Sequence, residues 1–140
     1  IPLVTSIVIA FASLGRNVPF AFNRKEKKDH GEGGVIIGTP LKGRVLIVDD
    51  VISAGTSVNE SVNLILEEGA KPSGIAISID REEKGTGLLS AVEEIKETHH
   101  LPICHLTSLQ EIMRYIEHHE TYASHINAMR DYQKLYGIKA

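Results

Sequence analysis

Strand-like and helix-like segments alternate along most of this 140-residue chain. The clearest strand is the apolar run RVLIV at residues 44–48, and the segment after it repeats apolar side chains at helical spacing (Val58, Val62 and Ile65) up to Gly69. Parallel strands need crossover connections, which are usually helices that pack on the faces of the sheet. The alternation therefore predicts an α/β fold with a mostly parallel sheet flanked by helices on both faces.

The remaining elements follow from the same periodicities. Strands are expected at residues 18–22, 35–38, 74–80 and 102–108, and helices at residues 3–14, 88–98, from 109 onward and at 121–135. Two pairs have the spacing of a capping box, in which a serine and a glutamate three residues later each accept a hydrogen bond from the other's backbone N–H. These pairs are Ser57 with Glu60 and Ser108 with Glu111. Helices are expected to begin at both places.

Composition limits the class of protein. The length suits one domain covering residues 1–140, and the apolar stretch at residues 7–12 is too short to span a membrane. The formal net charge of −3 gives no support for a nucleic-acid partner, so any cationic site must be local. The single cysteine, Cys104, excludes an internal disulfide and fits a cytoplasmic location, and its side chain is expected to be buried. Because the first residue is Ile1 rather than methionine, we expect the chain to start inside a longer protein.

The loop after the 44–48 strand carries the residues best suited to chemistry. Asp49 and Asp50 end the strand, and Gly55 permits backbone conformations that are closed to other residues. A loop that leads into a helix start turns several N–H groups toward one point, where the helix dipole also favours an anion such as a phosphate monoester. Hydroxyl donors are supplied by Ser53, Thr56 and Ser57. Because the carboxylates accept hydrogen bonds from groups such as sugar hydroxyls, the loop predicts a ribose 5-phosphate site.

The stretch VLIVDDVISAGTS at residues 45–57 resembles the phosphoribosyl-pyrophosphate signature of the type I phosphoribosyltransferases. The resemblance implies that Asp49 and Asp50 lie beside the ribose hydroxyls and act in catalysis, where their charge favours the cationic ribose. The residues implied in holding the phosphoribosyl group through backbone N–H groups and hydroxyls are Val51, Ile52, Ser53, Ala54, Gly55, Thr56 and Ser57. The alternative for this loop is a helix-entry turn with solvated acids.

A cationic segment, FNRKEKKDHGEGG at residues 22–34, precedes that strand. Its acidic residues partly cancel the charge, and composition alone favours a solvated, flexible connection. The segment also resembles the mobile catalytic loop of orotate phosphoribosyltransferases. The residues thereby implied in contacting the pyrophosphate are Arg24, Lys25, Lys28 and His30. Lys28 and His30 are implied to be catalytic, and the loop to reach the active site of a neighbouring subunit, which implies a homodimer with shared active sites.

The reaction of that family explains why such a loop carries cations. Breaking the bond between C1 of the ribose and pyrophosphate leaves negative charge on the leaving group, which Lys and Arg side chains stabilise. Closure of the loop excludes water, which would otherwise compete with the nitrogen of the base. Mg²⁺ is the expected cofactor because it prefers oxygen ligands and keeps several waters, and no protein ligand is assigned to it.

Arg81 follows the strand at residues 74–80 and is the candidate contact for the second substrate. An arginine fork can hold a planar carboxylate through two hydrogen bonds, and orotate carries one. The resemblance implies that Arg81 binds orotate together with Ser53, at a position where the family commonly has threonine. Taken alone, an arginine at a strand end more often pairs with a neighbouring acid, here Glu82 or Glu83.

The resemblance covers nearly the whole chain and implies a phosphoribosyltransferase domain that lacks its amino-terminal part and serves pyrimidine biosynthesis. Its substrates would be phosphoribosyl pyrophosphate and orotate. Two other functions stay open: a phosphoribosyl-pyrophosphate-binding regulator without turnover, and a phosphorylation-receiver domain, which VLIVDD also resembles, with Asp80 as the acceptor. A zinc site is disfavoured, because the histidines occur as adjacent pairs that would point about 100° apart on a helix.

Overall fold

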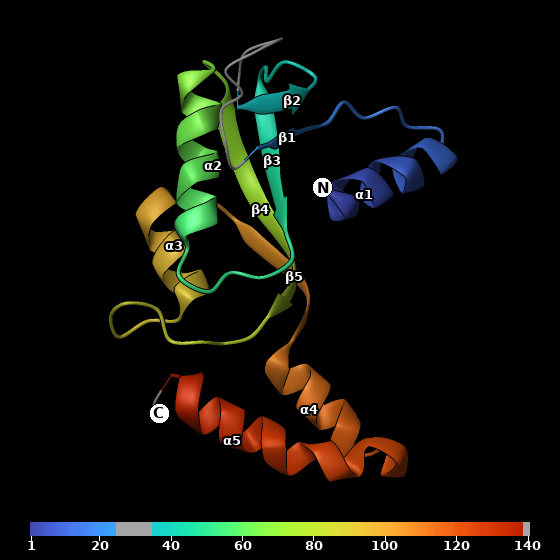
Figure 1. Ribbon diagram of the computed structural model, residues 1–140, viewed down its shortest axis with the longest axis vertical. Coiled ribbons are helices and arrows are strands. Elements are labelled where there is room, and N and C mark those ends of the chain that lie inside the picture. The colour runs from blue at the N-terminus through green and yellow to red at the C-terminus, as the bar shows by residue number, and fades with distance from the viewer. Residues whose placement is uncertain (25–34, 139–140) are drawn as a thin grey trace.

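The computed structural model describes residues 1–24 and 35–138 (Figure 1). Its elements in chain order are α1 (Pro2–Ser13), β1 (Ala21–Asn23), β2 (Ile36–Gly38), β3 (Arg44–Asp49), α2 (Thr56–Glu67), β4 (Lys71–Asp80), α3 (Ala91–His99), β5 (Ile103–Ser108), α4 (Leu109–Glu117), the 3₁₀ helix η1 (Glu120–His125) and α5 (Ile126–Tyr136). Most of the cationic segment 22–34 lies outside the described residues, including Lys25, Lys28 and His30.

Three parallel strands form the main sheet in the order β3-β4-β5. The register places Ile75 of the central strand beside Ile47 on one side and Ile103 on the other. Strands β1 and β2 form a separate antiparallel pair. Helices α2 and α3 cover one face of the main sheet, and α1 lies on the opposite side of β3 (Figure 1). The predicted α/β fold, with a parallel sheet between helices, is therefore confirmed.

The core lies between the sheet and helices α2 and α3. Because side chains alternate along a strand, Ile75 and Ile77 point to the same face, together with Ile47 of β3. The helical residues buried against this face are Val58, Val62, Ile65, Ala91 and Ile95. Their packing fixes the carboxyl ends of β3 and β4, and hence the places where the following loops begin.

The opposite face of the sheet is more open. Leu46 is 55% exposed and Leu106 is 86% exposed, and within the described part of the chain no residue of α1 is buried. Cys104 is exposed, so the expectation of a buried cysteine is wrong. The reason is its register: Cys104 pairs with Ala76 and lies on the face that α2 and α3 leave uncovered.

Helix starts agree with the capping analysis at one of the two expected places. The Ser108–Glu111 capping box is present with both hydrogen bonds. The Ser57–Glu60 box is wrong, because α2 begins at Thr56 after the N-cap residue Gly55 and Ser57 therefore lies inside the helix.

Other boundaries shift by a few residues. Helix α3 starts at Ala91 rather than at residue 88, because Ser90 and Glu93 form a capping box. Strand β1 starts only at Ala21, and the last helical segment begins as a 3₁₀ helix before it continues as α5. No helix in residues 1–24 and 35–138 has the length and apolar character needed to cross a membrane.

Candidate active site

The carboxyl ends of β3 and β4 meet at one edge of the sheet, and the loops that follow them form the candidate site. Asp49 at the end of β3 pairs with Ile77 of β4. The backbone oxygen of Asp50 accepts hydrogen bonds from the N–H groups of Ser78 and Ile79, at 2.9 and 3.1 Å. These bonds attach the start of the 50–55 loop to the neighbouring strand, so the loop leaves the sheet in a fixed direction.

The two acidic residues differ in their surroundings. Asp49 is half-buried, and its carboxylate accepts hydrogen bonds from the N–H of Asp50 at 3.0 Å and from Ser57 Oγ at 3.1 Å. Asp50 is exposed, and its Oδ1 accepts a hydrogen bond from the N–H of Val51 at 2.8 Å. Asp49 is therefore held in place by the start of α2, whereas the Asp50 carboxylate faces solvent, where a hydroxyl-bearing ligand can reach it.

The start of α2 offers an anion site. Gly55 is the N-cap residue, with φ 71° and ψ 0°, and within the described residues no side chain caps the helix and no acidic residue lies in its first turn. The N–H groups of a first helical turn have no partner in the helix, and the helix dipole makes this end positive. This end of α2 is therefore suited to a phosphate group.

Gly55 also has a packing role. A Cβ atom at this buried position would lie 2.5 Å from Cδ1 of Ile95 in α3. Glycine is thus required both by the left-handed backbone and by the close approach of α3.

Residues of the 51–57 stretch differ in what they can present to a ligand. Ile52 is 3% exposed and belongs to the core, so only its backbone is available for binding. Val51 is half-buried. The side chains that the structure leaves exposed are Ser53, Ala54, Thr56 and Ser57. The polar surface of the loop therefore comes from its three hydroxyls and from the backbone.

Arg81 lies directly against this loop. Its Nη2 donates to Ser53 Oγ at 2.5 Å and to Glu83 Oε2 at 3.1 Å. The structure thus brings together the two residues that the sequence assigns to orotate, and it also contains the acid pairing expected of an arginine alone. The exposed fraction of the Arg81 side chain is 34%, so the guanidinium is accessible from outside while two partners orient it.

Arg24 is the basic residue of the cationic segment that the structure describes. It lines a hollow of about 950 Å³ together with Asp49 and Ser57. The other walls of this hollow come mainly from β1, β3 and α2. Of the four residues implied in contacting the pyrophosphate, Arg24 therefore lines the same hollow as Asp49 and Ser57, whereas Lys25, Lys28 and His30 lie outside the described residues.

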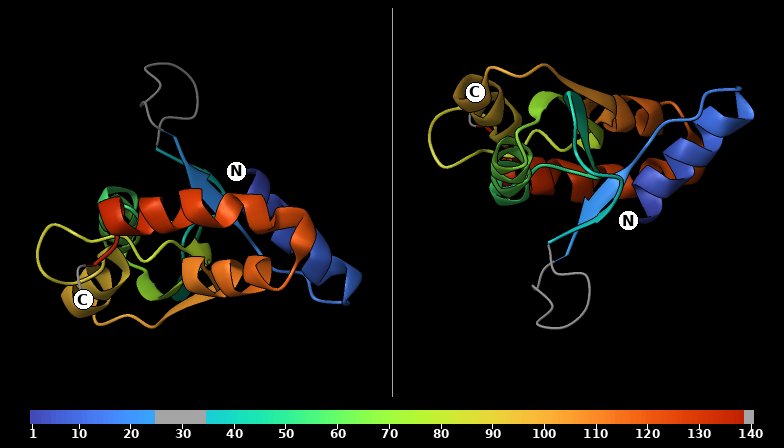
Figure 2. Two further views of the ribbon diagram at one scale, coloured as in Figure 1. Left: turned by 90° about the horizontal axis from the view of Figure 1, so that it is seen from below. Right: turned by 90° about the horizontal axis from the view of Figure 1, so that it is seen from above.

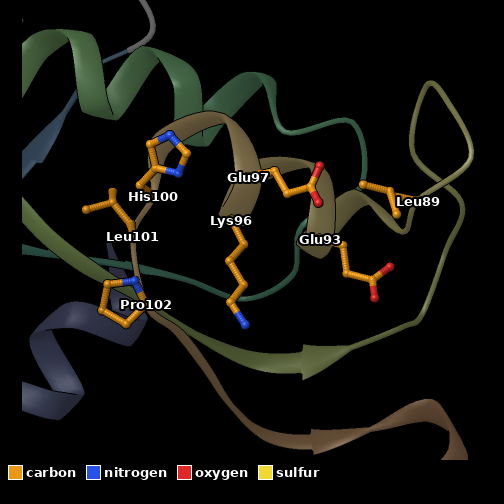
Figure 3. A pocket seen from close by; sticks show the side chains of 7 residues that line it. All are labelled: Leu89, Glu93, Lys96, Glu97, His100, Leu101 and Pro102. Carbon is orange, nitrogen blue, oxygen red and sulfur yellow. The ribbon is translucent and has the colours of Figure 1, made fainter.

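A second hollow, of about 780 Å³, lies along α3 and contains none of the candidate site residues (Figure 3). Its lining residues are Leu89, Glu93, Lys96, Glu97, His100, Leu101 and Pro102. The polar side chains drawn in Figure 3, those of Glu93, Lys96, Glu97 and His100, come from α3 and its C-terminal end. The chemistry therefore belongs to the edge after β3 and β4.

Metal ligands are sparse in the part of the chain that the structure describes. Within residues 1–24 and 35–138 no group of three or more His, Cys, Asp or Glu side chains could hold a metal ion. Three histidines have other partners: His99 Nε2 lies 2.5 Å from Asn59 Oδ1, and the Nδ1 atoms of His118 and His119 lie 2.8 and 2.7 Å from the backbone oxygens of Arg114 and Tyr115. Asp49 and Asp50 fit an ion such as Mg²⁺ that takes few protein ligands, with the rest coming from substrate oxygens and water.

Two residues of this edge were not predicted from the sequence. Glu83 is expected only as an alternative partner of Arg81, and Tyr132 only as part of the helix expected at residues 121–135. In the structure the Tyr132 hydroxyl donates a hydrogen bond to Glu83 Oε1. The two residues are 49 positions apart, and no local pattern connects them.

Comparisons with known proteins identify the family. The model of the phosphoribosyl transferase domain matches residues 1–97. The chain is 53% identical to the orotate phosphoribosyltransferase of Chromobacterium violaceum over 136 residues, which are 97% of this chain and 64% of that protein. It is also 53% identical to the enzyme of the same name from Thiobacillus denitrificans over 138 residues, 99% of this chain and 65% of that protein. The chain thus spans less than two thirds of the length of these relatives.

Solved structures give the same result. The crystal structure of orotate phosphoribosyltransferase from Francisella tularensis superimposes with a TM-score of 0.75 at 33% sequence identity, covering 97% of this chain and 62% of that chain. The Mycobacterium tuberculosis orotate phosphoribosyltransferase in complex with phosphoribosyl pyrophosphate gives a TM-score of 0.55 at 26% identity, over 69% of this chain and 51% of that chain. With a sequence match over residues 1–97 and a matching fold, the chain belongs to the phosphoribosyl transferase domain family, and the relatives that it matches over nearly its whole length are orotate phosphoribosyltransferases.

Proposed function

We propose that the protein is an orotate phosphoribosyltransferase, which transfers the phosphoribosyl group of phosphoribosyl pyrophosphate to orotate and yields orotidine 5′-phosphate and pyrophosphate in pyrimidine biosynthesis. The observation that carries the proposal is the contact between Arg81 and Ser53. This contact places a carboxylate-binding guanidinium on the same loop whose far end is the uncapped start of α2. One loop would therefore hold the phosphate of the sugar at one end and the carboxylate of the base at the other.

The roles of the loop residues follow from their positions. The 5-phosphate would accept hydrogen bonds from the first N–H groups of α2, including that of Ser57, and from the exposed hydroxyls of Ser53 and Thr56. The ribose hydroxyls would donate to Asp50, whose carboxylate is exposed, while Asp49 is held by Ser57. Both negative charges would favour the positive character that the ribose gains at C1. These assignments keep every acceptor and donor paired with a partner of the opposite kind.

The transfer exchanges one bond at C1 of the ribose for another. The bond to the pyrophosphate oxygen breaks with its electron pair leaving on pyrophosphate, and a ring nitrogen of orotate, having lost its proton, forms the new bond. Arg24 lines the hollow beside Asp49 and would meet the departing charge. Lys25, Lys28 and His30 are proposed for the same task from the sequence alone. Mg²⁺, when bound, would neutralise charge on the pyrophosphate, with Asp49 and Asp50 as the nearest oxygen ligands that this chain offers.

Three further properties are proposed with the activity. The protein is proposed to be a homodimer with shared active sites, because the cationic segment resembles a loop that serves the neighbouring subunit. A cytoplasmic location is proposed from the single cysteine, Cys104, which is free and exposed. The chain is proposed to form one domain. Membership in the phosphoribosyl transferase domain family removes the receiver-domain alternative.

The test is release of pyrophosphate from phosphoribosyl pyrophosphate, measured in the complete protein with and without orotate. We expect release only when orotate is present, with orotidine 5′-phosphate formed in equal amount. Lys28→Ala should lower turnover by about 100-fold or more with phosphoribosyl-pyrophosphate affinity mostly retained, because the lysine acts on the leaving group. Lys42→Ala, at an exposed lysine outside the candidate site, is the matched control.

Two results would contradict the proposal. Binding of phosphoribosyl pyrophosphate without any orotate-dependent release would identify a regulator in place of an enzyme. Unchanged turnover in Lys28→Ala would remove the leaving-group role from Lys28.

A further inference from the structure

The turn that follows β4 is held in an unusual backbone conformation. Glu82 has φ 54°, in the left-handed region that residues with a side chain rarely adopt. Its N–H donates to Asp80 Oδ1 at 2.9 Å, and its Oε2 accepts from the N–H of Gln110 at 3.2 Å, in the first turn of α4. The turn therefore holds Arg81 and Glu83 at defined positions on either side of Glu82.

The Glu83 carboxylate connects Arg81 with the last helix. Oε2 accepts from Arg81 Nη2 at 3.1 Å, and Oε1 accepts from the Tyr132 hydroxyl. The Glu83 side chain is only 14% exposed, and its backbone oxygen accepts from the N–H of Ala91 at 2.9 Å, at the start of α3. With both carboxylate oxygens engaged, the plane of the carboxylate is fixed, and so is the edge of the guanidinium that it contacts.

Helix α5 is brought to this turn by contacts that do not involve the Tyr132 hydroxyl. The N–H of Lys84 donates to the backbone oxygen of Tyr136 at 2.8 Å, and Glu83 and Gly137 form an isolated antiparallel bridge. Figures 1 and 2 show α4 and α5 lying beyond the carboxyl ends of the strands, where α5 runs back toward the loop after β4. Loss of the hydroxyl should therefore leave the helix in place and change only what Glu83 is bonded to.

Two further features, at Arg81 and at Tyr132, agree with a binding site for a ligand that carries oxygen atoms. Among the described residues Arg81 Nε is buried and has no hydrogen-bond partner. A buried donor without a partner is one that a ligand or water would satisfy. The pKa of Tyr132 is raised, mainly by the hydrogen bond to Glu83 and to a smaller extent by burial. Its hydroxyl therefore stays protonated and continues to donate.

We propose that Glu83 and Tyr132 are positioning residues, which hold the guanidinium of Arg81 in the orientation that receives the carboxylate of the base. This inference rests on the proposed function, because it assigns orotate as the ligand of Arg81. A guanidinium that is oriented before the ligand arrives binds a carboxylate more tightly, because less conformational freedom is lost on binding. The last helix of the chain thereby contributes to substrate affinity, although its own residues need not touch the substrate.

The test compares Tyr132→Phe with Tyr136→Phe in the complete protein. Tyr136 is the matched control, because its ring packs against that of Tyr132 with centroids 4.8 Å apart and a phenylalanine retains this contact. We expect Tyr132→Phe to raise the KM for orotate about fivefold to tenfold, since one hydrogen bond to a charged group is lost. The KM for phosphoribosyl pyrophosphate should stay at the wild-type value and the thermal unfolding midpoint should fall by only a few degrees, because one hydrogen bond is lost; Tyr136→Phe should change none of the three.

A double variant adds a readout that a purely structural role would not give. Because Tyr132 acts through Glu83, adding Tyr132→Phe to Glu83→Ala should raise the orotate KM no further than Glu83→Ala does alone. Equal orotate KM values for Tyr132→Phe and Tyr136→Phe would overturn the inference, as would a parallel loss of affinity for both substrates together with a lower unfolding midpoint. Wild-type protein that does not use orotate would instead overturn the proposed function, and the inference with it.

Discussion

At the scale of single residues, Gly55 is fixed by two constraints that can be separated. Its φ of 71° favours glycine, and a Cβ atom would crowd Ile95 at 2.5 Å. Gly69 just beyond the other end of α2 has φ 72°, but nothing lies within 4 Å of the place where its Cβ would be. Replacing either glycine would therefore strain the backbone, but only a side chain at residue 55 would also be crowded by a neighbour.

We expect Gly55→Ala to lower the free energy of unfolding more than Gly69→Ala does. Both variants should lose about 1 kcal/mol from the left-handed backbone, and Gly55→Ala should lose about 1–3 kcal/mol more from overpacking against Ile95. Urea unfolding followed by circular dichroism measures the difference. Placing Gly55→Ala in an Ile95→Val background should recover part of the loss. Equal losses in the two glycine variants would show that α3 makes room for the methyl group.

The site was predictable from the sequence only where local pattern decides position. Asp49, Asp50 and Arg81 could be placed at one edge because the carboxyl ends of adjacent parallel strands meet there, and the structure puts them at that edge. The contact between Tyr132 and Glu83 depends on the path of α4 and α5 after the sheet ends. That path is set by tertiary packing, which no spacing in the sequence encodes.

At the scale of elements, three capping boxes with the same spacing show how far local pattern reaches. The box at Ser108 was predicted and is present, and the box at Ser90 was not predicted and is also present. The box at Ser57 fails, because Asp49 accepts the hydrogen bond of that hydroxyl and Gly55 already ends the loop. A tertiary contact therefore decides whether a local motif is used.

Glu94 is the side chain that ties α3 to the loop between β4 and α3. Its carboxylate accepts hydrogen bonds from the N–H of Thr86 at 2.9 Å, from Thr86 Oγ1 at 3.1 Å and from the N–H of Gly87 at 2.6 Å. These bonds lower the pKa of Glu94, with the N–H of Thr86 as the largest contribution. One carboxylate, that of Glu94, therefore holds the loop between β4 and α3 against α3 itself.

This arrangement predicts a pH-dependent contribution to stability. A carboxyl whose pKa is lower in the folded state stabilises the fold above its unfolded pKa, about 4.3 for glutamate, and the contribution is lost as pH falls through the folded pKa. Glu94→Gln should therefore unfold at a lower temperature than wild type at pH 7, and the two should converge as the pH is lowered below that range. Glu97→Gln, at an exposed glutamate on the same helix, should follow wild type throughout. A gap between Glu94→Gln and wild type that persists in acid would contradict the hydrogen-bond account.

At the scale of the whole molecule, the two faces of the sheet differ in how well helices cover them. Leu46 and Leu106 are exposed on the face of the sheet away from α2 and α3, and α1 contributes no buried residue in the described part of the chain. The order of strands and helices was predictable because alternation along the sequence encodes it. Which face of the sheet stays open could not be predicted, because it depends on what else covers the sheet.

The proposed homodimer with shared active sites makes a prediction that only an assembly can satisfy. If the cationic segment of one subunit serves the site of its partner, Lys28→Ala and Asp50→Asn disable the same site when they are in different subunits. A mixed dimer then has one site with both defects and one with neither. Co-expression of the two variants should restore about a quarter of wild-type turnover, because random pairing makes half of the dimers mixed and each has one intact site.

The matched control for this experiment pairs Lys28→Ala with His30→Ala. Both changes lie in the same segment, so each site of a mixed dimer receives one defective copy and no intact site forms. Turnover of that mixture should stay at the mean of the two variants measured alone. If the Lys28 and Asp50 variants also gave only their mean, each subunit would carry a complete site of its own, and Lys28 would have to act beside the Asp50 of its own chain. Recovery confined to the first pairing would assign Lys28 and Asp50 of each working site to different subunits.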